Sequence, residues 1–97
     1  MNLSILGSTG SIGTQSLDVA RLNKDIKIKA LTANSNVDIL EQQVREFSPE
    51  LVVVTNEDSA KTLKVKIADT NTKVLSGESA LIEAATFESA DTVLNSL

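Results

Sequence analysis

The sequence predicts an α/β fold in which a mainly parallel sheet of about five strands is covered by helices on both faces. Five short apolar runs alternate with four helix-like segments along the 97 residues, and this alternation is typical of repeated βα units around a parallel sheet. A turn with three glycines joins the first run to the first helix. Because a chain of this length can bury one core, we expect a single domain over residues 1–97.

Short aliphatic runs mark the strands, which we expect at residues 3–6, 26–32, 51–54, 73–75 and 90–96. In the second run Ile28 and Ala30 alternate with Lys27 and Lys29, which is typical of a strand with one exposed face, although a central parallel strand often starts in this way before it becomes buried. The third run is uninterrupted and rich in valine, as expected for a strand that helices cover on both sides.

Four helices are predicted between these strands, at about 12–22, at 37–47, after Thr55, and at 78–85. The second has the clearest amphipathic pattern, with apolar residues three or four positions apart at Val37, Leu40, Val44 and Phe47. Asn36 is its expected N-cap, and Pro49 ends it because the residue before a proline avoids helical geometry. Thr55 and Asp58 have the spacing of a capping box at the start of the third helix.

The composition excludes several kinds of chemistry. Without cysteine or histidine, the chain has no disulfide, no thiolate nucleophile and no imidazole acid–base group, and its scattered carboxylates lack metal-binding spacing. Carboxylates, lysines and hydroxyls are then the only reactive side chains, and their positions suggest neither a metal site nor acid–base work. A net charge of −4 and only two aromatic residues argue against nucleic acid and anionic membranes as partners. No apolar run approaches the length of a membrane span, about 18 residues, and we expect a bacterial, cytoplasmic protein.

The turn after the first strand is the candidate site. Its glycines have the spacing G-x-x-G-x-x-G, a variant of the dinucleotide-binding G-x-G-x-x-G in which Ser8 holds the first fingerprint position. A helix start offers unpaired N–H donors and the positive end of its dipole, and glycine lets a phosphate approach. We predict a Rossmann-like nucleotide-binding loop formed by Gly7, Ser8, Thr9, Gly10, Ser11 and Ile12, closed by Gly13. The alternative is a tight turn that only connects strand and helix.

Several stretches resemble one enzyme family in the same order along the chain. They are Ile5-Leu6-Gly7-Ser8-Thr9-Gly10-Ser11-Ile12-Gly13, Gln15-Ser16-Leu17-Asp18-Val19, Asn36-Val37, Glu46-Phe47-Ser48-Pro49 and Val74-Leu75-Ser76-Gly77. Over essentially all of its length, the sequence is similar to the N-terminal NADPH-binding domain of 1-deoxy-D-xylulose 5-phosphate reductoisomerase.

The resemblance implies the function of a longer enzyme. Members of this family convert 1-deoxy-D-xylulose 5-phosphate to 2-C-methyl-D-erythritol 4-phosphate in the methylerythritol phosphate route of isoprenoid biosynthesis, with NADPH and a divalent metal, Mg or Mn. Their metal ligands, substrate-binding residues and catalytic residues correspond to sequence beyond Leu97, which stands at or just after the last predicted strand. We therefore expect a fragment of a homodimeric parent, truncated after its fifth strand, and no turnover by this chain alone.

The resemblance also implies where the cofactor lies. It adds contacts from the loop after the second strand and from the end of the last strand, at Asn34, Ser35, Asn36, Asn95 and Ser96. Many relatives have a cation at the position of Ser35, where it holds the 2′-phosphate of NADPH. NADPH stays the expected cofactor because no Asp or Glu directly follows the second strand to bind the ribose hydroxyls of NAD.

Two other functions fit the same residues. One is a non-catalytic Rossmann module that senses NADP and regulates a partner, and the other is a folded scaffold without nucleotide affinity. Asn36 also suits a purely structural role as an N-cap, and Asn95 and Ser96 also suit a solvent-exposed strand end. Binding of NADPH would leave the enzyme and the sensor open, whereas binding of neither NADPH nor NADH would favour the scaffold.

Overall fold

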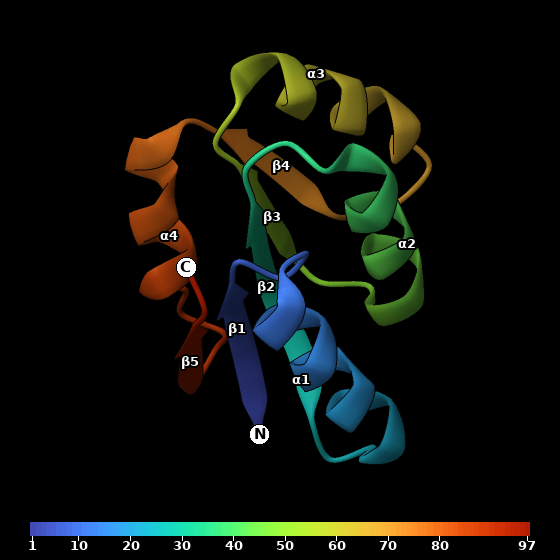
Figure 1. Cartoon of the computed structure of the whole chain (residues 1–97), viewed down its shortest axis with the longest axis vertical. Helices are drawn as coiled ribbons and strands as arrows, with labels where there is room; N and C mark the ends of the chain where they lie inside the picture. The colour runs from blue at the N-terminus through green and yellow to red at the C-terminus, as the bar shows by residue number, and fades with distance from the viewer.

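Strands and helices alternate along the computed structural model, which describes all residues from 1 to 97 (Figure 1). In chain order the elements are β1 (Asn2–Leu6), α1 (Ser11–Leu22), β2 (Lys27–Ala33), α2 (Val37–Phe47), β3 (Leu51–Val54), α3 (Glu57–Lys66), β4 (Lys73–Ser76), α4 (Leu81–Ala85) and β5 (Thr92–Asn95). A short 3₁₀ turn, η1 (Glu78–Ala80), leads directly into α4. None of the helices has the length and apolar character that crossing a bilayer requires.

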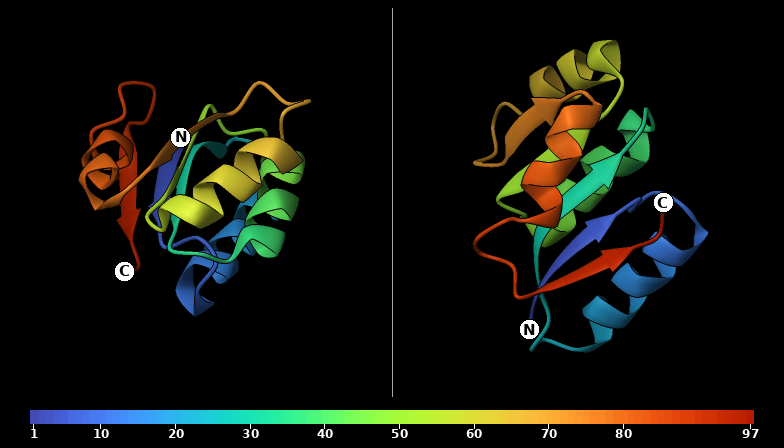
Figure 2. Two further views of the ribbon diagram at one scale, coloured as in Figure 1. Left: turned by 90° about the horizontal axis from the view of Figure 1, so that it is seen from above. Right: turned by 90° about the vertical axis from the view of Figure 1, so that its left-hand side faces the viewer.

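The five strands form one parallel sheet in the order β4-β3-β2-β1-β5. From β1 to β4 each connection steps to the neighbouring strand, and α1, α2 and α3 lie together on one face (Figures 1 and 2). The last connection returns across the sheet to the far side of β1 and places α4 on the opposite face, as expected when right-handed crossovers change direction. The predicted Rossmann-like α/β fold with helices on both faces is therefore confirmed.

The core has two parts, one on each face of the sheet. The larger contains 14 buried residues, including Leu17, Leu40 and Leu63 from the three helices on that face. The smaller contains 6 buried residues, among them Ala80 and Ala84 of the segment that crosses the other face. The buried hydrophobic residues are all aliphatic, and four polar residues are buried beside them, Ser4, Ser8, Thr32 and Gln43.

One strand departs from its predicted pattern. Ile28 belongs to the larger core and Ala30 to the smaller, so they face opposite sides of the sheet although they are two residues apart. The cause lies in the pairing with β1: Leu3 pairs with Ile28 and Ser4 pairs with Ala30, so that Lys29 is skipped. An extra residue of this kind reverses the side to which the following residues point.

Helix caps agree with the sequence in one case and differ in another. The Oδ1 of Asn36 accepts a hydrogen bond from Ile39 N at 3.4 Å, which confirms it as the N-cap of α2. The predicted capping box at Thr55 is wrong, because the N-cap of α3 is Asn56, whose Oδ1 accepts from Ser59 N at 2.9 Å. The hydroxyl of Thr55 is used elsewhere, in a contact with the preceding loop described below.

The direction of the connections changes between β1 and β5. The chain leaves β1 for the face that carries α1, and it reaches β5 from the face that carries α4. In open parallel sheets, ligands bind outside the carboxyl ends of the strands at such a reversal. The glycine turn follows β1 and Ser96 follows β5, so both lie at this point.

Candidate nucleotide-binding site

The glycine turn leaves β1 at Gly7 and enters α1 at Ser11. Gly7 has φ +84°, a left-handed conformation that suits glycine, and a Cβ there would stand 3.1 Å from Ser96 O. Its N–H donates to both the carbonyl oxygen and the Oγ1 of Thr32 at the end of β2, at 3.1 and 3.0 Å. The turn is thus fixed at its origin by the two strands that flank β1.

The other half of the turn is open and has unpaired donors. Gly10 is the N-cap of α1 and offers no side-chain oxygen, and the first turn of the helix contains no acidic residue. The backbone N–H groups of Thr9, Ser11 and Ile12 have no acceptor within the chain, and neither hydroxyl of Thr9 or Ser11 is hydrogen-bonded. These donors lie at the N-terminus of α1, the positive end of its dipole, where an anion is stabilised.

Ser8 is the exception within the turn. It is fully buried, and its N–H donates to Thr32 O at 2.8 Å. Its hydroxyl donates to the Oε1 of Gln43 at 2.8 Å, and its carbonyl oxygen accepts from the Nε2 of Gln43 at 2.9 Å. The expected cofactor contact by Ser8 is therefore not supported, because all its polar groups are used inside the protein.

The second loop follows β2 and lies at the same edge of the sheet. Asn34, Ser35 and Asn36 are all exposed. The Oδ1 of Asn34 accepts from the hydroxyl of Thr55 at 2.7 Å, which leaves its Nδ2 as a free donor. The hydroxyl of Ser35 has no partner within the chain, whereas Asn36 is engaged as the α2 cap. Asn34 and Ser35 are therefore the residues of this loop with free polar groups.

The end of β5 closes the turn on its other side. Ser96 N donates to Leu6 O at 2.9 Å, and its hydroxyl lies 2.8 Å from Leu6 O and 3.0 Å from Gly7 O. The Oδ1 of Asn95 accepts from Leu97 N at 3.1 Å. β1 and β5 run side by side toward this edge (Figure 2). Ser96 thus supports the backbone at Gly7, while the Nδ2 of Asn95 is unpaired.

The three segments of the candidate site carry no charged side chain. The ion pairs of the chain lie elsewhere and hold helices together: Arg21 of α1 pairs with Glu46 of α2, and Arg45 of α2 pairs with Asp69 after α3. Hydrogen bonding to these guanidinium groups lowers the pKa of Glu46 and of Asp69 below the usual carboxyl range. An anion at the glycine turn would therefore meet the positive end of the helix dipole, N–H groups and free hydroxyls, and no carboxylate of these segments.

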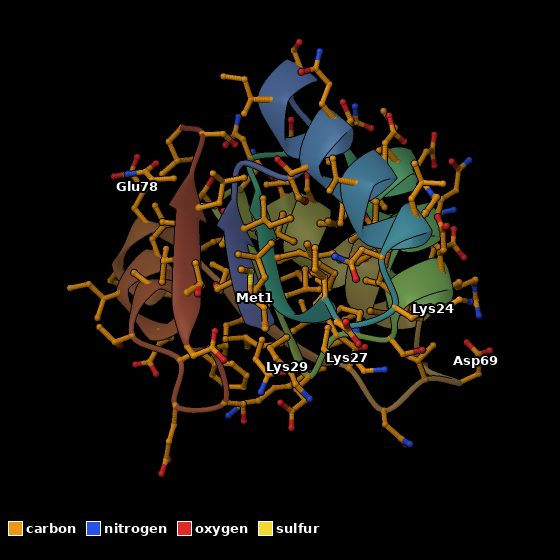
Figure 3. All side chains as sticks on the ribbon, turned by 90° about the horizontal axis from the view of Figure 1, so that it is seen from below. Met1, Lys24, Lys27, Lys29, Asp69 and Glu78 are labelled. Carbon is orange, nitrogen blue, oxygen red and sulfur yellow. The ribbon has the colours of Figure 1, made fainter.

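The largest hollow of the molecule lies at the opposite end of the sheet. It measures about 570 Å³ and is lined by residues that include Lys24, Lys27, Lys29 and Phe47. Figure 3 shows the three lysines at the end of the molecule where Met1 lies. The glycine turn is an open edge and lines none of the hollows. No group of three or more metal-ligating carboxylates comes together in the chain, so these residues do not fit a divalent metal.

Comparison with known proteins decides the family. The family model described as 1-deoxy-D-xylulose 5-phosphate reductoisomerase matches residues 3–97. The chain belongs to the 1-deoxy-D-xylulose 5-phosphate reductoisomerase family. The reductoisomerase of Lachnospira eligens is 53% identical over 96 residues, which are 99% of this chain and 25% of the relative. That of Lachnoclostridium phytofermentans is 50% identical over 95 residues, 98% of this chain and 24% of the relative.

Solved reductoisomerase structures have the same fold over this region. A crystal structure of the enzyme in complex with NADPH, fosmidomycin and magnesium matches with a TM-score of 0.90 and 40% identity, covering 96% of this chain and 23% of that one. The Zymomonas mobilis enzyme in complex with NADPH matches with a TM-score of 0.88 and 33% identity, covering 95% and 24%. The chain spans about a quarter of the length of the curated relatives it matches, which are bacterial.

Gln43 and Thr55 are among the residues of the site region that were not predicted from the sequence. Gln43 bonds to the glycine turn from α2, and Thr55 bonds to the second loop from the end of β3. Gln43 had a detectable signal, since it stands three residues after Leu40 and next to Val44, on the apolar side of its helix. Thr55 had none, because its pattern favoured a helix cap.

Proposed function

We propose that residues 1–97 form the NADPH-binding unit of a reductoisomerase that acts on 1-deoxy-D-xylulose 5-phosphate. The observation that carries the proposal is the group of unpaired N–H and hydroxyl donors at the start of α1, at the carboxyl edge of the sheet and beside the reversal of strand order. This is the arrangement in which Rossmann-like folds receive a pyrophosphate. The family membership of the chain gives the nucleotide its identity.

Each part of the edge has its own task in this proposal. The N–H groups of Thr9, Ser11 and Ile12 bind the pyrophosphate oxygens, and Gly10 keeps the approach open. The Nδ2 of Asn34 and the hydroxyl of Ser35 donate to the phosphorylated adenosine ribose. Both groups are free in the chain, and a donor set without a carboxylate suits a 2′-phosphate better than the unmodified ribose hydroxyls of NADH.

The reaction itself belongs to the longer protein. We propose that the parent converts 1-deoxy-D-xylulose 5-phosphate to 2-C-methyl-D-erythritol 4-phosphate for isoprenoid biosynthesis, as a homodimer in the bacterial cytoplasm. NADPH supplies the hydride, and the present residues orient the nucleotide without touching the reacting carbonyl. The divalent metal is assigned to the rest of the parent, because the carboxylates of this chain do not gather into a metal-binding group.

Calorimetric titration of the 97-residue chain with NADPH and with NADH tests the binding step. We expect saturable NADPH binding, weaker NADH binding, and no substrate-dependent NADPH oxidation. Gly10→Val should abolish binding, since its side chain would occupy the space in front of the donors, while the fold persists because a Cβ at this position stands 3.7 Å from its nearest neighbour, Gly7 O. Thr62→Val, on the exposed side of α3, is the control and should bind as the wild type does.

The outcomes separate the candidate functions. Absence of binding for both nucleotides would favour the scaffold and contradict the proposal. Equal affinity of the wild type and Gly10→Val would place the nucleotide away from the glycine turn. Substrate-dependent oxidation of NADPH by the chain alone would show that catalytic groups lie within it. Expression of the complete parent, followed by an assay of reductoisomerase activity, distinguishes an enzyme from a non-catalytic NADP sensor.

A further inference from the structure

We propose that Gln43 of α2 is a positioning residue that fixes the glycine turn relative to the second loop, so that one nucleotide can engage both. The proposal rests on the proposed function and concerns a residue that lies in neither loop. Gln43 is only 5% exposed and is one of four buried polar residues in the chain. Both atoms of its amide group bond to Ser8, the innermost residue of the turn.

The direction of these hydrogen bonds is determined by chemistry. The carbonyl oxygen of Ser8 can only accept, so the group that faces it at 2.9 Å must be the Nε2 of Gln43. The Oε1 is then left as the acceptor for the Ser8 hydroxyl at 2.8 Å. A reversed amide would set two oxygens against each other. The reciprocal pair therefore holds Ser8 in one orientation.

A second element, β2, also holds Ser8. The remaining polar group of Ser8, its N–H, already donates to Thr32 O of β2. Ser8 is thus held by both β2 and α2. The exposed residues Gly10, Ser11 and Ile12 begin only two positions after it. A shift of Ser8 would move the donors of the turn.

α2 also carries the second loop. Asn36 caps the helix seven positions before Gln43, and Ser35 immediately precedes that cap. A helix packed on the core through Leu40 and Val44 behaves as a rigid rod over this distance. The separation between the pyrophosphate donors and the ribose-binding loop is therefore set jointly by Gln43 and by Thr32 of β2, which accepts from the N–H of Ser8. A nucleotide that spans both loops depends on this separation, whereas a fragment held by the second loop alone does not.

Amide hydrogen exchange of the nucleotide-free chain tests the positioning directly. Gln43→Leu keeps the size of the side chain and removes both hydrogen bonds, and Gln42→Leu, at the exposed neighbouring glutamine, is the matched control. We expect Gln43→Leu to leave the Ser8 N–H almost unprotected, so that it exchanges at least tenfold faster than in the wild type while amides of β3 keep their rates, because the ordered turn becomes the minor state. Unchanged exchange at Ser8 would overturn the proposal.

Ligand binding tests the consequence. If the fraction of molecules with an ordered turn falls to about a tenth, the Kd for NADPH rises about tenfold in Gln43→Leu. The Kd for adenosine 2′-monophosphate, which the second loop binds alone, should stay within about twofold of the wild type. Gln42→Leu should leave both values unchanged. Equal weakening of the two ligands would mean general damage to α2 and would contradict the positioning role. A wild type that binds no NADPH defeats the proposed function, and the exchange experiment still decides the role of Gln43.

A conservative variant supplies a second signature. In Gln43→Glu the ionised carboxylate accepts from the Ser8 hydroxyl but cannot donate to the Ser8 carbonyl, whereas the protonated acid can do both. Burial beside a carbonyl raises the pKa of this carboxyl, so protection of Ser8 relative to the wild type should recover as the pH falls from about 8 to about 5. A ratio between variant and wild type that does not change with pH would contradict the assigned hydrogen bonds.

Discussion

Substituting Gly13 by alanine should damage the fold far more than the same change at Gly10, although both glycines belong to one motif. Gly13 is buried in the first turn of α1. A Cβ there would collide with the carbonyl oxygen of Gly7 and would stand 2.7 Å from the Cα and 2.9 Å from the carbonyl carbon of Ser8. All three atoms are backbone, so no side-chain rotation relieves the overlap. At Gly10 the nearest atom is 3.7 Å away, an ordinary contact.

The loss of unfolding free energy in Gly13→Ala follows from these distances. Carbon atoms pack at about 3.5–4.0 Å, so the added methyl or the backbone of Ser8 must move by roughly 0.8 Å or more. Overpacking typically costs about 1–3 kcal/mol, and a backbone obstacle places Gly13→Ala at the upper end. Alanine regains about 1 kcal/mol of helix propensity, which leaves a loss of about 2 kcal/mol or more. Gly10→Ala should stay within about 1 kcal/mol of the wild type, as expected for an N-cap change.

Thermal denaturation gives the melting temperature of each variant and urea denaturation gives its unfolding free energy, both followed by circular dichroism. For a domain of this size about 1 kcal/mol corresponds to about 4–8 °C, so the melting temperature of Gly13→Ala should fall by about 8–16 °C. Its midpoint in urea should fall without a change in slope, since the unfolded state exposes the same surface. A Gly13→Ala variant within about 0.5 kcal/mol of Gly10→Ala would refute the view that the close approach at Gly13 is structural.

Three further outcomes are expected. Ser35→Arg should tighten NADPH binding in calorimetry and leave NADH unchanged, because the guanidinium pairs with the 2′-phosphate; equal effects on both would remove the second loop from the site. The hydrogen bond from Arg21 lowers the pKa of Glu46, so the pair stabilises the fold above the ordinary carboxyl pKa of 4.5. This contribution is lost as the pH falls below that value. Arg21→Met should therefore flatten the dependence of the unfolding free energy on pH. Leu63→Ala, at a fully buried site, should cost about 2–5 kcal/mol in urea, whereas Val65→Ala, 78% exposed, should cost less than about 0.5 kcal/mol.

The sequence predicts the fold well because its elements are separated by clear signals. The stripe that includes Leu40 and Val44 marks α2, the uninterrupted run at 51–54 marks a strand buried on both faces, and the helix-like segments between runs imply parallel pairing. The side reversal at Lys29 could not be predicted in this way. It depends on the register that β2 adopts against β1, and local alternation contains no information about that register.

The candidate site shows the same limit. Sequence places Ser8 among the donors of the turn because hydroxyl residues commonly face phosphate, and nothing local distinguishes it from Thr9 or Ser11. The difference arises from tertiary structure, since Ser8 points inward to Gln43 while Thr9 and Ser11 remain unpaired. A polar residue on the apolar side of a helix is therefore a useful signal, because a buried amide requires partners and indicates which residue of a distant loop is held in place.

The three glycines of the turn consequently have different tasks. Gly7 adopts a positive φ and lies against Ser96, and Gly13 allows the helix to approach the backbone of Ser8. Only Gly10 has open space in front of it, at the end of α1 where the donors are unpaired. The G-x-x-G-x-x-G spacing thus combines two positions that shape the turn with one that admits a ligand. A glycine-rich motif of this kind should be tested at its open position, since substitution at the other two destabilises the fold and so confounds any loss of binding.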